Sequence, residues 1–111
     1  MKNKDKELFA VQAEICKALA NAKRLEIIHL LATKEKQSAA ELISQVGLTK
    51  ANLSQHMRVL KQAGIVVFKR EGTQISYQLA SPKIGEACET LHEFLVEHFE
   101  QRRNLTDRKS D

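Results

Sequence analysis

The sequence predicts a mainly α-helical fold with one β-hairpin, and three observations support this prediction. Five segments place apolar residues at the three- and four-residue spacing of an amphipathic helix. One stretch, residues 65–79, has the β-rich and alternating pattern of two strands. The chain has 111 residues, 42% of them hydrophobic and 29% charged, which is typical of one globular domain. We therefore expect residues 1–111 to form a single domain in the order H-H-H-H-E-E-H, with an ordered core over about 7–100.

Length and composition also limit the function. The chain has four glycines, no phosphate-binding glycine loop and no nucleophile paired with a base, so we expect neither an enzyme nor a bound cofactor. No apolar run approaches the roughly 18 to 20 residues that cross a bilayer, which predicts a cytoplasmic protein. Cys16 and Cys88 are too few for a secreted disulfide scaffold, and a reducing compartment would keep them as free thiols.

Two helices are expected in the first third of the chain. Residues 7–20 carry apolar side chains on two faces, so this helix needs two packing partners. Asn21 is suited to cap a second helix over residues 22–33, which has one wide apolar face.

Two shorter helices are expected next, separated by a tight turn. Ser38-Ala-Ala-Glu41 has the pattern of a capping box, which predicts the start of a short helix that ends near Gly47. Thr49 can cap a further helix over residues 50–63, with Leu53, Met57 and Leu60 turned inward.

The last part of the chain predicts a hairpin and a final helix. The hairpin covers residues 65–79, and its polar, basic tip contains Gly72, which can adopt a positive φ. Ser81-Pro82 opens the last helix, because proline is tolerated at a first helical position. We expect the polar tail, residues 101–111, to fray.

A helix, a short glycine-containing turn and a second helix form the helix-turn-helix unit, whose second helix enters the major groove of DNA. The hairpin that follows makes the predicted fold a winged helix-turn-helix. Asparagine and glutamine side chains can pair with adenine, arginine with guanine, and an alanine methyl can contact thymine. The face of residues 50–63 opposite the apolar stripe carries such groups: Lys50, Ala51, Asn52, Ser54, Gln55 and Arg58. The alternative interpretation is that this is an ordinary solvated helix face.

Charge along the chain favours the DNA-binding interpretation. Residues 49–74 carry five basic residues against one acidic residue, a net charge of +4, whereas residues 83–100 carry one against five, a net charge of −4. Lys69, Arg70 and Gln74 on the wing are expected to contact the DNA backbone in or beside the minor groove, adding affinity with little specificity. His56 can donate to a phosphate or base, or pack at the edge of the motif.

Three segments carry a family pattern: Lys17-Ala-Leu-Ala-Asn-Ala-Lys-Arg-Leu-Glu-Ile-Ile28, Leu48-Thr-Lys-Ala-Asn-Leu-Ser-Gln-His-Met-Arg-Val-Leu-Lys-Gln-Ala-Gly-Ile65 and Ile75-Ser-Tyr-Gln-Leu79. Together they resemble the arsenical-resistance repressor (ArsR/SmtB) family of bacterial winged-helix regulators. The resemblance extends over roughly residues 10–98. The resemblance implies a homodimer built from the first and last helices. It also implies a repressor that occludes a promoter with an inverted-repeat operator and is released when an effector binds. Ser54, Gln55 and His56 fall where the family's recognition helix contacts its operator.

The resemblance does not identify the effector. Arsenic and cadmium sensors of the family carry Cys-x-Cys at the start of the third helix, where this chain has Ser38, Ala39 and Ala40. Zinc and nickel sensors use Asp, His and Glu pairs on the last helix. Here that helix offers Glu89-x-x-His92 and His98, either as weak metal ligands or as exposed polar contacts.

Cys16 and Cys88 lie on the apolar stripes of the first and last helices, which we expect to pack together. They are either small core residues or a thiol switch that oxidants or reactive sulfur species could link. Thiol-sensing relatives place one cysteine on the second helix, where this chain has none. The function alternatives are thus a thiol-responsive repressor, a metal-responsive repressor and a winged-helix module that binds only proteins.

Overall fold

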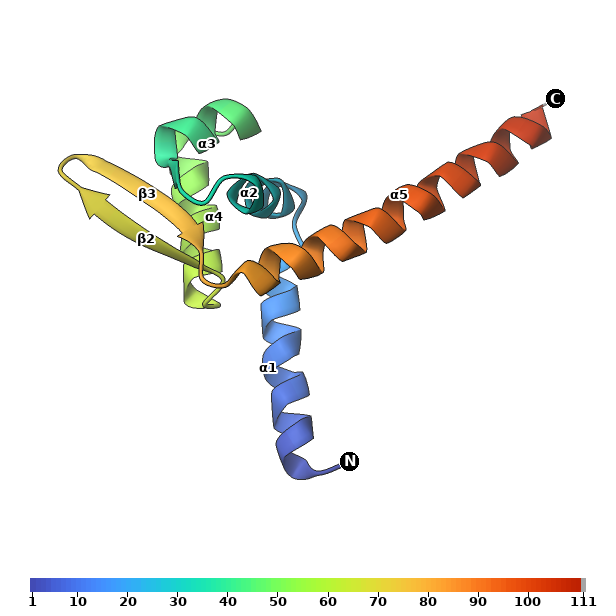
Figure 1. Ribbon diagram of the computed structural model, residues 1–111, viewed down its shortest axis with the longest axis horizontal. Coiled ribbons are helices and arrows are strands. Elements are labelled where there is room, and N and C mark those ends of the chain that lie inside the picture. The colour runs from blue at the N-terminus through green and yellow to red at the C-terminus, as the bar shows by residue number, and fades with distance from the viewer. Residues whose placement is uncertain (111) are drawn as a thin grey trace.

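The computed structural model of the chain describes the backbone of residues 1–110 and the side chains of residues 1–103. The elements follow in this order: α1 (Asn3–Leu19), α2 (Ala22–Thr33), β1 (Gln37–Ser38), α3 (Ala39–Val46), α4 (Lys50–Gln62), β2 (Val66–Glu71), β3 (Gln74–Leu79) and α5 (Pro82–Ser110). Figure 1 shows the β2–β3 hairpin extending from one side of a helical core, while α1 and α5 project from the other sides. This architecture confirms the predicted mainly helical fold with a β-hairpin wing.

The hydrophobic core lies between α2, α3, α4 and the base of the wing. Its largest fully buried side chains come from these elements: Ile27, Ile28, Leu42, Leu53, Leu60 and Ile65. The inward face of α4 consists of Leu53, Met57 and Leu60, as the spacing of these residues predicts. The outward face of the same helix is therefore free to meet a partner.

The predicted helix caps are present in the structure. The Asn21 side chain accepts a hydrogen bond from the amide of Arg24, and the Thr49 side chain accepts one from the amide of Asn52. Ser38 and Glu41 form the complete capping box. Gly47 ends α3 with a φ of 72°, a left-handed conformation that favours glycine. These caps set the turn between α3 and α4 and so fix where α4 begins.

The sheet contains one strand that the sequence pattern does not predict. Its strand order is β1-β3-β2, and both pairs are antiparallel. The two-residue strand β1 pairs Gln37 with Tyr77 and Ser38 with Ser76. The side chain of Gln37 is buried and donates a hydrogen bond to the carbonyl of Leu30. β1 thereby attaches the wing to the segment between α2 and α3.

Both terminal helices are longer than we expected. α1 begins at Asn3 rather than near residue 7, and α5 continues to Ser110 rather than ending near residue 100. Their extra residues are mostly polar, but they include neither proline nor glycine, so nothing interrupts helical hydrogen bonding. Within the described residues, no helix combines the length and apolarity needed to span a bilayer.

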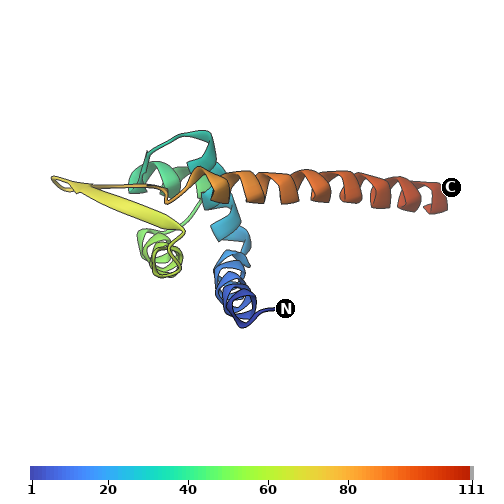
Figure 2. The ribbon, with the colours of Figure 1, turned by 60° about the horizontal axis from the view of Figure 1, so that its bottom comes forward.

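α1 and α5 expose large apolar side chains that the core does not cover. Figures 1 and 2 show both helices extending away from the rest of the molecule. The exposed residues are Leu8, Phe9 and Val11 on α1 and Leu91, Phe94, Leu95, Val96 and Phe99 on α5. Exposed apolar side chains gathered on a helix in this way are typical of a protein–protein interface.

Candidate DNA-binding surface

Helix α4 lies beside the base of the wing (Figure 1), and its polar face is exposed to solvent. All six residues that the sequence assigns to the DNA-contacting face are exposed: Lys50, Ala51, Asn52, Ser54, Gln55 and Arg58. The face combines cationic groups for phosphates with amide and hydroxyl groups that can hydrogen-bond to base edges. Its composition and exposure suit a recognition helix.

His56 differs from these six residues because it points toward the molecule. Its side chain is half-buried, and its Nδ1 accepts a hydrogen bond from Nε of Arg24 at 3.3 Å. Burial and the nearby charge of Arg24 lower the pKa of His56, which keeps the imidazole neutral and able to accept this bond. This contact agrees with the packed role that the sequence allows for His56, and its contact with DNA stays a prediction.

Arg24 is a site residue that the sequence analysis did not identify. Its Nη1 also donates to the carbonyl of Ala18, at 3.1 Å, near the C-terminal end of α1. A single guanidinium on α2 therefore contacts both α1 and the recognition helix α4. Arg24 and His56 are 32 positions apart, and no local sequence pattern indicates that they meet.

The wing carries exposed polar residues toward its tip. Lys69, Arg70 and Gln74 are all exposed. Glu71 lies among them, and its carboxylate is 2.8 Å from Nζ of Lys36 and 3.7 Å from Nζ of Lys69. These lysines, Lys36 first, lower the pKa of Glu71. Lys69 is therefore partly neutralised, whereas Arg70 forms no salt bridge within the part of the chain described.

A cation–π contact also holds the wing against α4. Nζ of Lys61, in the last turn of α4, lies 3.9 Å from the centroid of the Phe68 ring on β2. The Phe68 ring in turn packs against Tyr77 of β3, with ring centroids 6.4 Å apart. Lys61 thus contributes to the position of the wing, a role that no local sequence pattern indicates.

The metal-ligand candidates on α5 are dispersed. Glu89 lies 3.8 Å from Nδ1 of His29, and the rings of His29 and His92 are 6.4 Å apart, whereas His98 stacks on Phe94. His29 itself is exposed on α2. Among the residues described, no group of three or more His, Cys, Asp or Glu side chains is arranged to hold a metal ion.

The two cysteines occupy different environments. Cys88 is half-buried and packs against the core, whereas Cys16 is exposed, so our expectation that both lie on inward faces is wrong for Cys16 in the single chain. Burial raises the pKa of Cys88, and the negative charge of a Cys16 thiolate raises it further.

Comparisons with known proteins agree with this architecture. A family model described as a helix-turn-helix domain matches residues 13–67. The HTH-type transcriptional regulator Rv0081 of Mycobacterium tuberculosis is 39% identical over 79 residues, which are 71% of this chain and 69% of the relative. The transcriptional activator HlyU of Vibrio cholerae is 36% identical over 78 residues, which are 70% of this chain and 71% of HlyU.

A solved structure extends the comparison beyond sequence. The winged helix-turn-helix domain of Mb0332 from Mycobacterium bovis, described as homodimeric and as a possible ArsR-family regulator, superposes with a TM-score of 0.80. It is 28% identical, and the match covers 91% of this chain and 93% of that domain. Such regulators bind DNA and are not enzymes. The sequence relatives, the family model and the shared winged-helix fold together show that this chain belongs to the ArsR/SmtB family of helix-turn-helix transcriptional regulators.

Proposed function

We propose that the protein is a homodimeric repressor that binds an inverted-repeat operator through α4 and the wing and leaves it when an effector binds. The observation that carries this proposal is the fully exposed polar face of α4, held at a fixed angle by its buried stripe and by Arg24. The exposed apolar residues of α1 and α5 supply a surface through which two copies can pair.

The proposed dimer makes a geometric prediction. Two α4 helices related by a two-fold axis should reach successive major grooves, roughly 34 to 36 Å apart along the DNA. Sedimentation of the DNA-free protein at micromolar concentration should therefore show a dimer. Replacing Leu91 and Leu95 on α5 with glutamate should produce a folded monomer, and a wild-type monomer would contradict the proposal.

Base contacts and backbone contacts can be separated by mutation. We expect Ser54→Ala and Gln55→Ala to reduce the preference for the operator over random DNA. We expect Lys69→Ala and Arg70→Ala to weaken binding to both DNAs and to lower the salt dependence by about 0.9 per lost phosphate contact. Arg70→Ala should have the larger effect, because Lys69 already lies near Glu71.

The control for charge is Lys83→Ala, which removes an exposed cation at the start of α5. Fluorescence anisotropy at several salt concentrations, with operator and random duplexes, provides the measurement. Equal losses on both DNAs for all four variants would show that the base-contacting face is misplaced. Binding that is independent of salt would favour the alternative, a winged-helix module that binds only proteins.

A thiol switch is the effector mechanism that one specific observation favours. The charge of a Cys16 thiolate raises the pKa of Cys88, which supports a pairing of the two thiols when α1 and α5 move toward one another. An oxidant such as hydrogen peroxide would convert the exposed Cys16 thiolate to a sulfenic acid. The Cys88 thiol would then displace water from it and form a disulfide, which would change how α1 and α5 pack.

Serine variants test this switch. Cys16→Ser and Cys88→Ser should each abolish the loss of operator binding on oxidation, while the reduced proteins bind normally. If the double variant still releases its operator when oxidised, the thiol mechanism is wrong. A zinc or nickel response that His92→Ala abolishes would instead support a metal-responsive repressor.

A further inference from the structure

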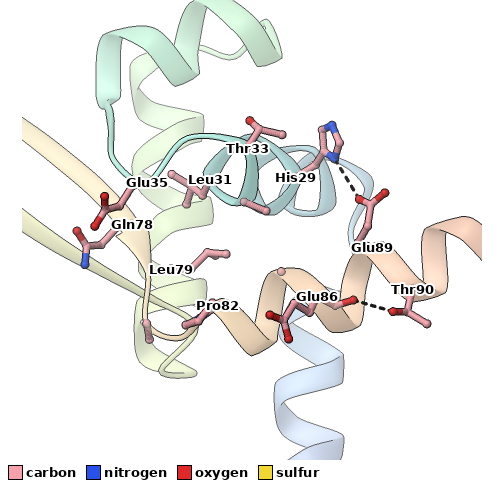
Figure 3. Close-up of a pocket in the computed structure, with 13 residues that line it drawn as sticks. His29, Leu31, Thr33, Glu35, Gln78, Leu79, Pro82, Glu86, Glu89 and Thr90 are labelled. Carbon is pink, nitrogen blue, oxygen red and sulfur yellow. Dashed lines mark hydrogen bonds and ion pairs between the residues drawn. The ribbon is translucent and has the colours of Figure 1, made fainter.

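A cavity lies away from the DNA-contacting face, between the C-terminal half of α2, the end of β3 and the first turns of α5. Figure 3 shows the side chains that surround it. Its volume is about 920 Å³, and it opens to solvent. This volume lies within the roughly 300 to 1,000 Å³ typical of small-molecule sites. None of the residues that we assign to DNA contacts lines it.

The floor of the cavity is apolar. It is formed by residues from all three elements: Leu31, Ala32, Leu79, Ala80 and Pro82. Gly85 of α5 also lines it and is buried. A Cβ atom at Gly85 would lie 3.0 Å from Cβ of Ala32 and 3.1 Å from Cδ1 of Leu79, so glycine allows α5 to approach this closely. The cavity thus has an apolar floor set by contacts between α2, β3 and α5.

The polar part of the lining is acidic, although the protein as a whole is basic. The carboxylates of Glu35, Glu86 and Glu89 line the cavity, and no lysine or arginine does. Glu89 points toward His29 and lies 3.8 Å from its Nδ1 (Figure 3). Glu35 and Glu86 form no salt bridge with any described residue. Two carboxylates beside an apolar floor are therefore available for a cationic ligand.

We infer that this cavity binds a small organic cation with an apolar body, of the arylalkylamine class. The apolar body would cover Leu79, Ala80 and Pro82, and the ammonium group would meet the carboxylates at the rim. The same carboxylates repel organic anions. A bare metal ion does not fit this site, because no three-ligand group is assembled in the described part of the chain.

The position of the cavity gives the ligand a route to regulation. Its walls include β3 of the wing and the first turns of α5, so a bound cation would fix the angle between them. This regulatory step rests on the proposed function, since it requires that α5 pair two copies and that the wing contact DNA. Binding of the cation itself requires neither.

Three probes with one aromatic body test the chemistry of the site. Full-length ¹⁵N-labelled protein is titrated with 2-phenylethylamine, 2-phenylethanol and 3-phenylpropionate, which are cationic, neutral and anionic. We expect the amine to shift the backbone amides of Ala32, Gly85 and Thr90. The alcohol and the acid should bind at least about fivefold more weakly, the factor that one exposed charge pair contributes in water at 4 Å.

Charge-removing variants locate the site. Glu35→Gln and Glu86→Gln should each weaken amine binding about fivefold, and Glu100→Gln, on α5 beyond the cavity, should leave it unchanged. Equal affinity for the three probes, or normal amine binding by both variants, would overturn the proposal. It would also be overturned if zinc shifted the same amides and His92→Ala abolished that shift, because the cavity would then serve a metal.

Operator binding provides a separate readout. Saturating 2-phenylethylamine should change operator affinity at least threefold in the wild-type protein, and Glu86→Gln should need about fivefold more amine for the same change. If the amine binds in the cavity and operator affinity stays the same, the regulatory inference is wrong and the cation site stands. If the protein binds no DNA with or without the amine, the proposed function fails, whereas the amide shifts still decide the cation site.

Discussion

Arg24→Ala should destabilise the protein by about 3 kcal/mol, because it removes two hydrogen bonds that join three helices. The guanidinium donates to the Ala18 carbonyl at 3.1 Å and to His56 Nδ1 at 3.3 Å. A hydrogen bond from a charged donor contributes about 1.5 to 3 kcal/mol. We take the lower value for each bond, because Arg24 is only half-buried. Urea unfolding at one fixed protomer concentration measures the loss.

Two further variants make this experiment specific. Arg58→Ala removes an exposed arginine from α4 and should change stability by no more than about 0.5 kcal/mol while weakening DNA binding. Arg24→Lys should lose an intermediate amount, because an ammonium group lacks the fork that reaches two acceptors at once. If Arg24→Ala proves no more destabilising than Arg58→Ala, Arg24 does not join these helices and the reasoning fails.

The remaining predictions concern the core and the response to pH. Leu60 is fully buried in α4, and Leu60→Ala should lower the free energy of unfolding by about 2 to 5 kcal/mol in urea, whereas the exposed Leu25→Ala should cost much less. The pKa of His56 is lower in the folded chain than the ordinary value of 6.5. Its contribution to stability is therefore fully present above pH 6.5 and is lost as the pH falls from there through the lower pKa of the folded state. The urea concentration at the unfolding midpoint should therefore decrease when the pH is lowered from 7.5 to 5.5. His56→Gln, which keeps an acceptor for Arg24 but does not titrate, should show a smaller fall, and an identical pH profile for both proteins would contradict this assignment.

The features that the sequence predicts correctly are those with local causes. Asn21, Ser38 and Thr49 cap their helices through residues three positions away, and Gly47 and Gly72 adopt the positive φ that their turns require. The apolar stripe of α4 likewise follows from its own spacing. Local patterns were therefore sufficient to predict the element order, apart from β1, and the exposed face of α4.

The features that the sequence does not predict depend on contacts between distant positions. The strand β1 exists because Gln37 pairs with Tyr77, which lies 40 positions later. The contact of Arg24 with His56 spans 32 positions. Neither leaves a periodic pattern, because each involves single residues on different elements. The cavity beside α5 has the same origin, since its lining comes from three elements that meet only in the folded chain.

The length of α5 makes it a lever arm whose pivot is its first turn. Its 29 residues extend about 43 Å at the rise of an α-helix, and Gly85 lies near the end that contacts α2 and β3. A tilt of roughly 5° at Gly85 would move the far end by roughly 3 Å. In a dimer paired through α5, the same tilt would instead displace the two α4 helices relative to one another. The angular stiffness of the contact among Gly85, Ala32 and Leu79 would then determine which spacing of DNA half-sites the protein accepts.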